Sequence, residues 1–144
     1  MSNYFIIDAQ LPSLNDYQAA CRANKYSGAD YKKKAQELVM WAIYQAHGKG
    51  TLRKVQTEEY PVTLNIAWHE KDRRRDVDNI KSAAKFVLDG MTKSGLIVDD
   101  GRRYVAQIHD TVIDDTNTYV VVEIIGRERD ENYRATNQPR RTKA

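Results

Sequence analysis

Apolar and polar residues alternate most regularly over residues 62 to 69, where Val62, Leu64, Ile66 and Trp68 occupy every second position. Successive side chains of a strand point to opposite faces of a sheet, so a period of two is typical of a strand with one buried face. The pattern predicts a strand here.

Three further segments also have the character of strands. Residues 119 to 125 are almost continuously apolar and rich in Val and Ile, which predicts a central strand covered on both sides. Residues 104 to 110 alternate less regularly and precede the turn-forming residues 114 to 117, so we expect a hairpin with the strand that follows. Residues 4 to 8 are a shorter candidate.

Two segments show helical spacing. Apolar residues recur at helical intervals after Asp30, a good N-cap residue, until Gly48 and Gly50 interrupt the pattern. A second apolar stripe begins near Asn79 and ends at Gly95. Residues 11 to 28 have no dominant period and are interpreted as a loop that contains at most a turn of helix. The sequence therefore predicts an α+β fold in the order β-α-β-α-β-β, with a small mixed sheet flanked by two helices.

The length and composition predict a single folded domain. The chain has 144 residues, of which 41% are hydrophobic and 30% charged, and one core typically organises about 100 to 200 residues. We assign residues 1–125 to the domain. Residues 126–144 have few apolar side chains, with six basic residues against three acidic ones, so we expect a basic, flexible C-terminal tail.

Neither a membrane nor a disulfide is expected. No apolar run approaches the roughly 18 to 20 residues that span a bilayer, and the N-terminus lacks the layout of a secretory signal. We therefore expect a cytoplasmic protein with no membrane partner. Cys21 is the only cysteine, which excludes an intrachain disulfide and a multi-thiolate metal site.

The densest chemical signal is the segment Arg73-Arg74-Arg75-Asp76-Val77-Asp78-Asn79, followed after the second predicted helix by Asp99-Asp100-Gly101. Carboxylates two residues apart in an extended segment lie on the same side of the chain, and they repel unless a proton or cation intervenes. Oxygen ligands suit Mg²⁺ or Mn²⁺, and such an ion can activate water for attack on a phosphodiester.

Two lysines add to this pattern. Lys81 and Lys85 lie three and seven residues after Asp78, so in one continuous helix all three share a face and either lysine could contact a phosphate. The alternative interpretation is structural: Asp78 caps the helix, the Asp99-Asp100 pair forms a turn, and the lysines are solvated.

Together these motifs resemble the RusA family of Holliday-junction resolvases. The resemblance rests on residues 73–91 and 95–100 and on an opening loop, Leu11-Pro12-Ser13-Leu14-Asn15-Asp16-Tyr17, and it covers roughly residues 4 to 125. It implies a homodimeric, Mg²⁺-dependent endonuclease of mixed α/β structure, often encoded by phages, that nicks four-way DNA junctions symmetrically. Mn²⁺ is a possible substitute, and no organic cofactor is expected.

The resemblance also implies roles for individual residues. Asp76, Asp78 and Asp100 match the catalytic, metal-binding aspartates, and Asp99 is the neighbour most easily confused with Asp100. The predicted helix is three residues longer here than in the compact members of the family. Counting back from residues 88–89 therefore assigns the family's essential lysine to Lys85. The further candidates are Lys81 and Asn79. We expect DNA contacts from Asn15, Arg22, Lys33, Arg73, Arg74 and Arg75.

The predicted function is resolution of four-way or otherwise branched DNA by a metal-activated water. A four-way junction is approximately two-fold symmetric, so a two-fold dimer would place one active site on each of two opposing strands. Two alternatives remain open. One is a module that binds branched DNA without cutting it. The other is a metal-dependent nuclease of broader specificity that acts on flaps, forks or RNA.

Overall fold

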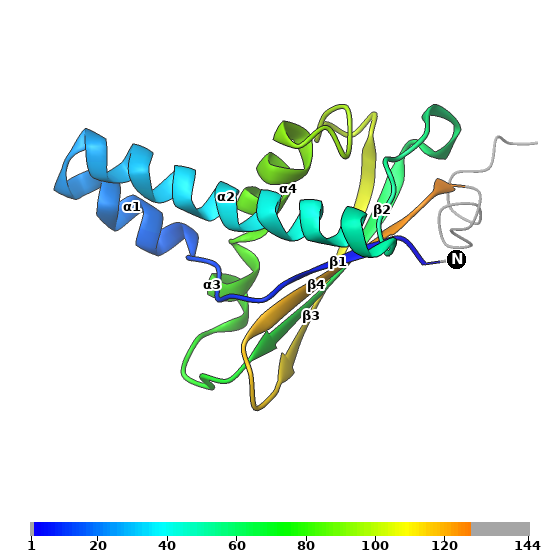
Figure 1. Cartoon of the computed structure of the whole chain (residues 1–144). Helices are drawn as coiled ribbons and strands as arrows, with labels where there is room; N and C mark the ends of the chain where they lie inside the picture. The colour runs from blue at the N-terminus through cyan, green and yellow to red at the C-terminus, as the bar shows by residue number, and fades with distance from the viewer. Residues whose placement is uncertain (1, 128–144) are drawn as a thin grey trace, which may run out of the picture.

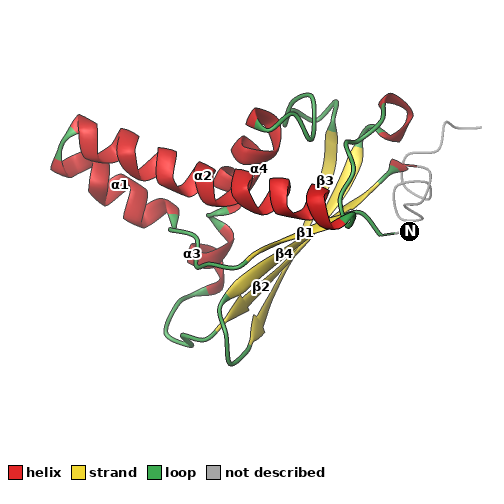
Figure 2. Ribbon diagram, in the orientation of Figure 1, coloured by secondary structure: helices red, strands yellow, loops and turns green. Residues whose placement is uncertain are grey.

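A four-stranded mixed β-sheet carries the fold, and its helices pack on one face of that sheet (Figures 1 and 2). The structure, a computed structural model, describes residues 2–127. The elements in chain order are β1 (Tyr4–Ile7), α1 (Leu14–Ala23), α2 (Lys25–Lys49), the 3-10 helix η1 (Thr57–Glu59), β2 (Val62–Glu70), α3 (Val77–Lys81), α4 (Ala84–Lys93), β3 (Val105–Asp114) and β4 (Tyr119–Ile125).

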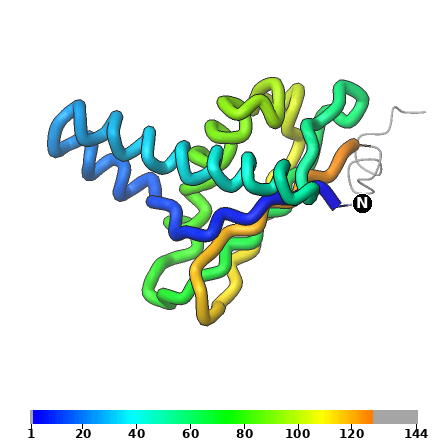
Figure 3. Tube along the Cα trace, in the orientation of Figure 1, coloured from blue at the N-terminus to red at the C-terminus, as the bar shows by residue number. Residues whose placement is uncertain are grey.

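The α+β class and the mixed sheet are confirmed, but the predicted hairpin is wrong. The strand order is β1-β4-β2-β3, so β2 lies between β3 and β4. β2 pairs in parallel with β3 and antiparallel with β4, while β1 and β4, near the two ends of the described chain, also pair antiparallel (Figure 3). The apolar β4 takes an inner position between two neighbours, and the more polar β3 takes an edge.

Only one face of β4 is covered, contrary to the prediction that both are. Its central position is confirmed, but Val120, Val122 and Ile124 are buried while the residues between them are half-buried. The same alternation holds in β2, where Leu64, Ile66 and Trp68 are buried on the helical side. The other face of the sheet is open because the helices occupy a single layer.

The segment predicted as a loop, residues 11–28, is largely helical. Ser13 accepts a hydrogen bond from the backbone of Asp16, and Asp16 accepts one from the backbone of Ser13, which forms a capping box at the start of α1. Helix α2 begins after Asn24, so Asp30 is not its N-cap. Periodicity missed α1 because the apolar side of this helix is short and only half-buried, at Leu14, Tyr17 and Ala20, with no fully buried residue.

The second predicted helix is divided into α3 and α4. At the junction the amide of Ala83 donates a hydrogen bond to the carbonyl of Ile80, and the amide of Phe86 donates one to the carbonyl of Ala83. Both hydrogen bonds join residues three positions apart. This tighter winding changes the rotation per residue, so one continuous stripe does not run from Asp78 through the later turns. Asp89 faces α2, where its carboxylate accepts a 3.2 Å hydrogen bond from the side chain of Gln36.

The core lies between the sheet and the layer of α2 and α4. Gly90 of α4 permits close contact with α2, since a Cβ at that position would lie 2.5 Å from Cγ1 of Val39. Gly50, with φ of 78°, ends α2 in the left-handed conformation. Within residues 2–127 no helix is both long enough and apolar enough to cross a membrane. The predicted tail lies outside the described residues, apart from Gly126 and Arg127.

Candidate active site

Loop 71–76 leaves the C-terminal end of β2 and is held there by a buried ion pair. Arg75 Nη1 donates a 2.6 Å hydrogen bond to Oε1 of Glu70, and both side chains are buried to about nine-tenths, at 12% and 6% exposed. Burial raises the pKa of the Glu70 carboxyl, which the Arg75 guanidinium opposes. The loop is therefore tied to the strand one residue before Asp76.

Asp76 and Asp78 follow this anchor and are both exposed. Asp76 is the N-cap residue of α3, but its side chain makes no capping hydrogen bond. Asp78 lies in the first turn and its Oδ1 accepts a 2.9 Å hydrogen bond from the amide of Asn79. The alternative interpretation of the sequence, in which Asp78 caps the helix, is wrong. The N-cap is Asp76, and the Asp76 carboxylate makes no capping hydrogen bond.

The N-terminal loop packs directly against this acidic segment. Nδ2 of Asn15 donates a 3.2 Å hydrogen bond to Oδ1 of Asn79, and the amide of Leu14 donates a 2.9 Å hydrogen bond to the hydroxyl of Ser82. Two of the predicted site residues, Asn15 and Asn79, are thus brought into contact although 64 positions separate them in the chain. The start of α1 and the start of α3 form one surface.

The two candidate lysines lie on either side of the junction between α3 and α4. Lys81 is the last residue of α3 and Lys85 the second residue of α4, and both are exposed. Both therefore remain available to a bound phosphate, but the tight turn between them removes the simple helical relationship to Asp78 on which the sequence prediction relied.

Asp99 and Asp100 lie at the opposite end of β2. The adjoining residue Val98 donates a backbone hydrogen bond of 3.0 Å to the hydroxyl of Tyr60, which precedes β2, and the backbone of Tyr104 accepts one from Val62. At a strand rise of about 3.3 Å per residue, β2 is roughly 26 Å long, and the two acidic pairs follow from its opposite ends. Both Asp99 and Asp100 are exposed.

One chain therefore does not assemble the predicted set of three aspartates. Residues 2–127 contain no group of three or more His, Cys, Asp or Glu side chains close enough to share a metal ion. Asp76 and Asp78 lie at one end of the sheet and Asp100 at the other.

The predicted DNA-binding arginines divide into two groups. Arg73 and Arg74 are exposed, and Arg74 forms a 3.0 Å ion pair with Asp72, which lowers the pKa of that carboxyl. Arg75 is turned inward toward Glu70, so its guanidinium is not part of the exposed basic surface. Arg22 in the last turn of α1 and Lys33 in α2 are exposed and lie on helices outside this loop.

The structure also identifies a cluster that sequence reasoning did not single out. Nδ1 of His69 lies 2.8 Å from Oδ2 of Asp115, and the His69 ring stacks on Tyr119 at a centroid distance of 4.1 Å. The Thr116 amide and the His69 ring lower the pKa of Asp115. The amide of Asp115 also donates to the carbonyl of Glu70, so the cluster supports the end of β2.

Glu70 itself could have been found from the sequence. Counting by twos from Leu64 through Ile66 and Trp68 places Glu70 on the buried side of β2, which is an unusual position for a carboxylate. Asp115 could not have been found in this way, because its contact with His69 depends on the crossing of the β3–β4 connection over the end of β2.

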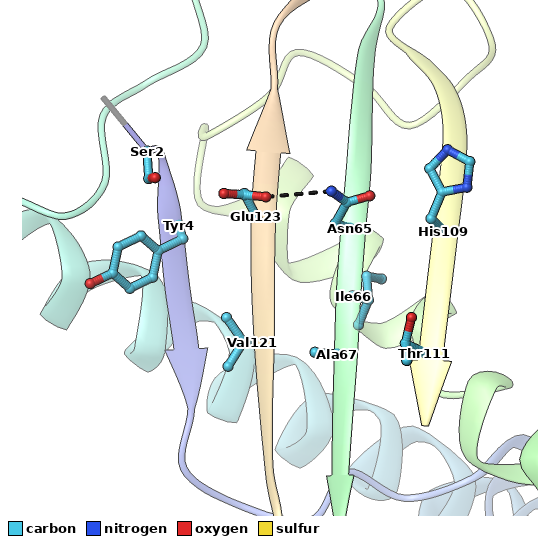
Figure 4. Close-up of a pocket in the computed structure, with 9 residues that line it drawn as sticks. All are labelled: Ser2, Tyr4, Asn65, Ile66, Ala67, His109, Thr111, Val121 and Glu123. Carbon is cyan, nitrogen blue, oxygen red and sulfur yellow. Dashed lines mark hydrogen bonds between the residues drawn. The ribbon is translucent and has the colours of Figure 1, made fainter. Parts of the chain in front are cut away.

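A separate depression of about 420 Å³ lies on the open face of the sheet (Figure 4). Within it, the side chain of Asn65 donates a 3.4 Å hydrogen bond to Glu123. Its lining consists of Ser2, Tyr4, Asn65, Ile66, Ala67, His109, Thr111, Val121 and Glu123. This lining carries a carboxylate and neither Lys nor Arg, so it does not suit a DNA backbone.

No known family model matches this chain. No curated protein matches it either.

Proposed function

We propose that this protein is a Mg²⁺-dependent endonuclease that cuts four-way DNA junctions as a homodimer. The observation that carries the proposal is the exposed pair Asp76 and Asp78, which projects from the start of α3 beside Asn15 and a basic loop. An acidic pair next to cationic side chains combines ligands for a hard cation with attraction for the phosphate backbone.

The residues present suit a divalent cation. Asp76 and Asp78 supply carboxylate oxygens, and Mg²⁺ commonly binds through one or two carboxylates while keeping several water ligands. When bound, the ion would supply an activated water and charge stabilisation for phosphodiester hydrolysis. The exposed amines of Lys81 and Lys85 can bind the negatively charged phosphate, and the hydrogen bond from Asn15 to Asn79 positions the start of α3.

A second copy of the chain accounts for Asp100. Within one chain Asp100 lies at the far end of β2 from Asp76, so a three-aspartate site requires Asp100 from the partner subunit. A two-fold dimer would contain two such sites, one for each of two opposing strands of a junction.

Cleavage of a synthetic four-way junction tests the proposal. We expect paired, symmetric nicks with Mg²⁺, none with EDTA, and a rate for Asp78→Asn that is lower by about 10² to 10³. Asp72→Asn is the matched control, because Asp72 lies in the same loop but is paired with Arg74. Equal rates for Asp78→Asn and the parent would refute the catalytic role, provided that the variant folds and keeps the parent's oligomeric state.

The alternatives give different results in the same assay. A binding module would hold the junction without cutting it in Mg²⁺ or Mn²⁺, and Asp78→Asn would bind more tightly because one repulsive charge is lost. A nuclease of broader specificity would cut flaps, three-way junctions or RNA as fast as four-way junctions.

Salt dependence tests the basic loop separately. Each neutralised phosphate contributes about 0.9 to the slope of log affinity against log salt on duplex DNA. Arg73→Ala combined with Arg74→Ala should therefore reduce the slope for junction binding by up to about 2. Arg53→Ala is the control, since Arg53 is bonded to Glu59 near the other end of β2. An unchanged slope in the double variant would exclude DNA contact by this loop.

A further inference from the structure

We infer that the exposed edge of β3 is the dimer interface, where it pairs antiparallel with β3 of a second copy. This inference deepens the proposed function, and its link to the active site rests on that function. The interface itself rests on three features of the described chain: an unprotected edge strand, the arrangement of charges at its two ends, and the separation of the acidic residues.

The two edges of the sheet differ in length. β1 has four residues, whereas β3 has ten and forms the opposite edge. A long edge strand presents a row of unpaired backbone groups, and proteins commonly protect such edges with prolines, lysines, bulges or short strands. β3 contains no proline and no lysine, its register irregularity with β2 lies near its start between Val105 and Gln107, and Ile108 and Ile113 are each 36% exposed. It therefore has the character of a strand that pairs with another chain.

Charges at the two ends of β3 are complementary in an antiparallel pair. Arg102 and Arg103 are exposed just before the strand begins, and Asp114 is exposed at its last position. In an antiparallel pair centred on the strand, the arginines of each copy lie beside Asp114 of the partner subunit. A parallel pair would place like charges together at both ends, which is unfavourable.

The same arrangement unites the divided acidic residues. β3 runs parallel to β2, so its C-terminal end lies at the end of the sheet where loop 71–76 and Asp76 begin. Antiparallel pairing brings the N-terminal end of the partner's β3 to this place. Asp100 precedes β3 by five residues, so Asp100 of the partner subunit arrives at the same end as Asp76 and Asp78. One interface thus accounts for both the open edge and the incomplete site.

Charge reversal with rescue tests the interface without DNA or metal. Sedimentation of the full chain should show a dimer, and Arg103→Asp or Asp114→Arg alone should raise the dimer Kd about tenfold or more, equivalent to about 1.4 kcal/mol. The combination of both should return the Kd to near the parent value, because the pair is restored with its signs exchanged. Glu58→Arg, an exposed reversal on η1, should leave the Kd unchanged.

Cross-linking locates the contact independently. In a Cys21→Ser background, His109→Cys near the middle of β3 should give a covalent dimer with a short bis-maleimide, and Ile6→Cys on the opposite edge strand should not. A monomeric parent overturns the inference, as does a dimer that the β3 reversals do not weaken or that cross-links through Ile6→Cys alone. A β3 dimer that does not cut junctions would refute the proposed function and leave the interface standing. A monomer that cuts them would refute the interface and the homodimeric part of the proposed function, and only the endonuclease activity would stand.

Discussion

The Arg75 guanidinium and the Glu70 carboxylate form a buried ion pair, with 2.6 Å between Nη1 and Oε1, immediately before the two aspartates of the candidate active site. The second oxygen of Glu70, Oε2, is also buried and has no hydrogen-bond partner within the described part of the chain. The ion pair with Arg75 therefore offsets most of the free-energy cost of burying the Glu70 carboxylate away from water.

Arg75→Ala should lower the free energy of unfolding by about 3 to 5 kcal/mol, because it leaves the Glu70 charge buried without its partner. Replacing both residues, with Glu70→Leu and Arg75→Met, should recover most of this loss, since no buried charge then remains. Urea unfolding of the parent and both variants measures the effect. Equal losses in the single and double variants would show that packing rather than charge is responsible.

The raised pKa of Glu70 predicts a specific pH dependence of stability. The folded state binds this proton more tightly than the unfolded state, so the free energy of unfolding should fall as pH rises from the ordinary value of 4.5 through the higher folded pKa. Glu70→Gln should remove this component, whereas Glu58→Gln, which alters an exposed carboxyl, should keep it. Unfolding measured across this pH range would contradict the prediction if Glu70→Gln had the parent's profile.

Gly90→Ala should destabilise the protein by about 1 to 3 kcal/mol, because the added Cβ would lie 2.5 Å from Cγ1 of Val39 and force α2 and α4 apart. Val39→Ala should relieve only part of this overlap in the double variant, because it removes Cγ1 but leaves the Cβ of residue 39 at 2.7 Å from the added Cβ. Gly48→Ala is the matched control: a Cβ there has no neighbour within 4 Å, so the helix should gain up to about 1 kcal/mol. Thermal unfolding distinguishes these results, and a stabilising Gly90→Ala would show that α2 and α4 can separate enough to accommodate the added Cβ.

The two candidate lysines can be separated by kinetics. Lys85→Ala should lower the rate of junction cleavage by about 10² to 10³ while leaving junction affinity nearly unchanged, as expected for a group that stabilises developing charge. Lys81→Ala should reduce the rate less than about tenfold, and Lys49→Ala, near the C-terminal end of α2, should have no effect. A larger loss for Lys81→Ala would exchange the two assignments.

Local patterns in the sequence determined the elements that form the core. The period of two in residues 62–69 and the apolar run at residues 119–125 predicted β2 and β4, because burial on a strand follows from the alternation of neighbouring side chains. Asp76 and Asp78 could be placed at the start of a helix because the helical spacing of apolar residues begins directly after them. Helix α1 was not predicted because it buries no side chain fully and its apolar side is short.

Tertiary structure decided which strands are neighbours and which site residues meet. β3 pairs with β2 rather than with β4, and this depends on contacts between segments that are distant in the chain. The periodicity within one segment carries no information about which segment it will contact. The pairing of β3 with β2 places Asp100 at the far end of β2 from Asp76. The contact of Asn15 with Asn79 likewise joins segments 64 positions apart in the chain. Arg75 turns inward because Glu70, five residues earlier, is buried and requires a counter-charge.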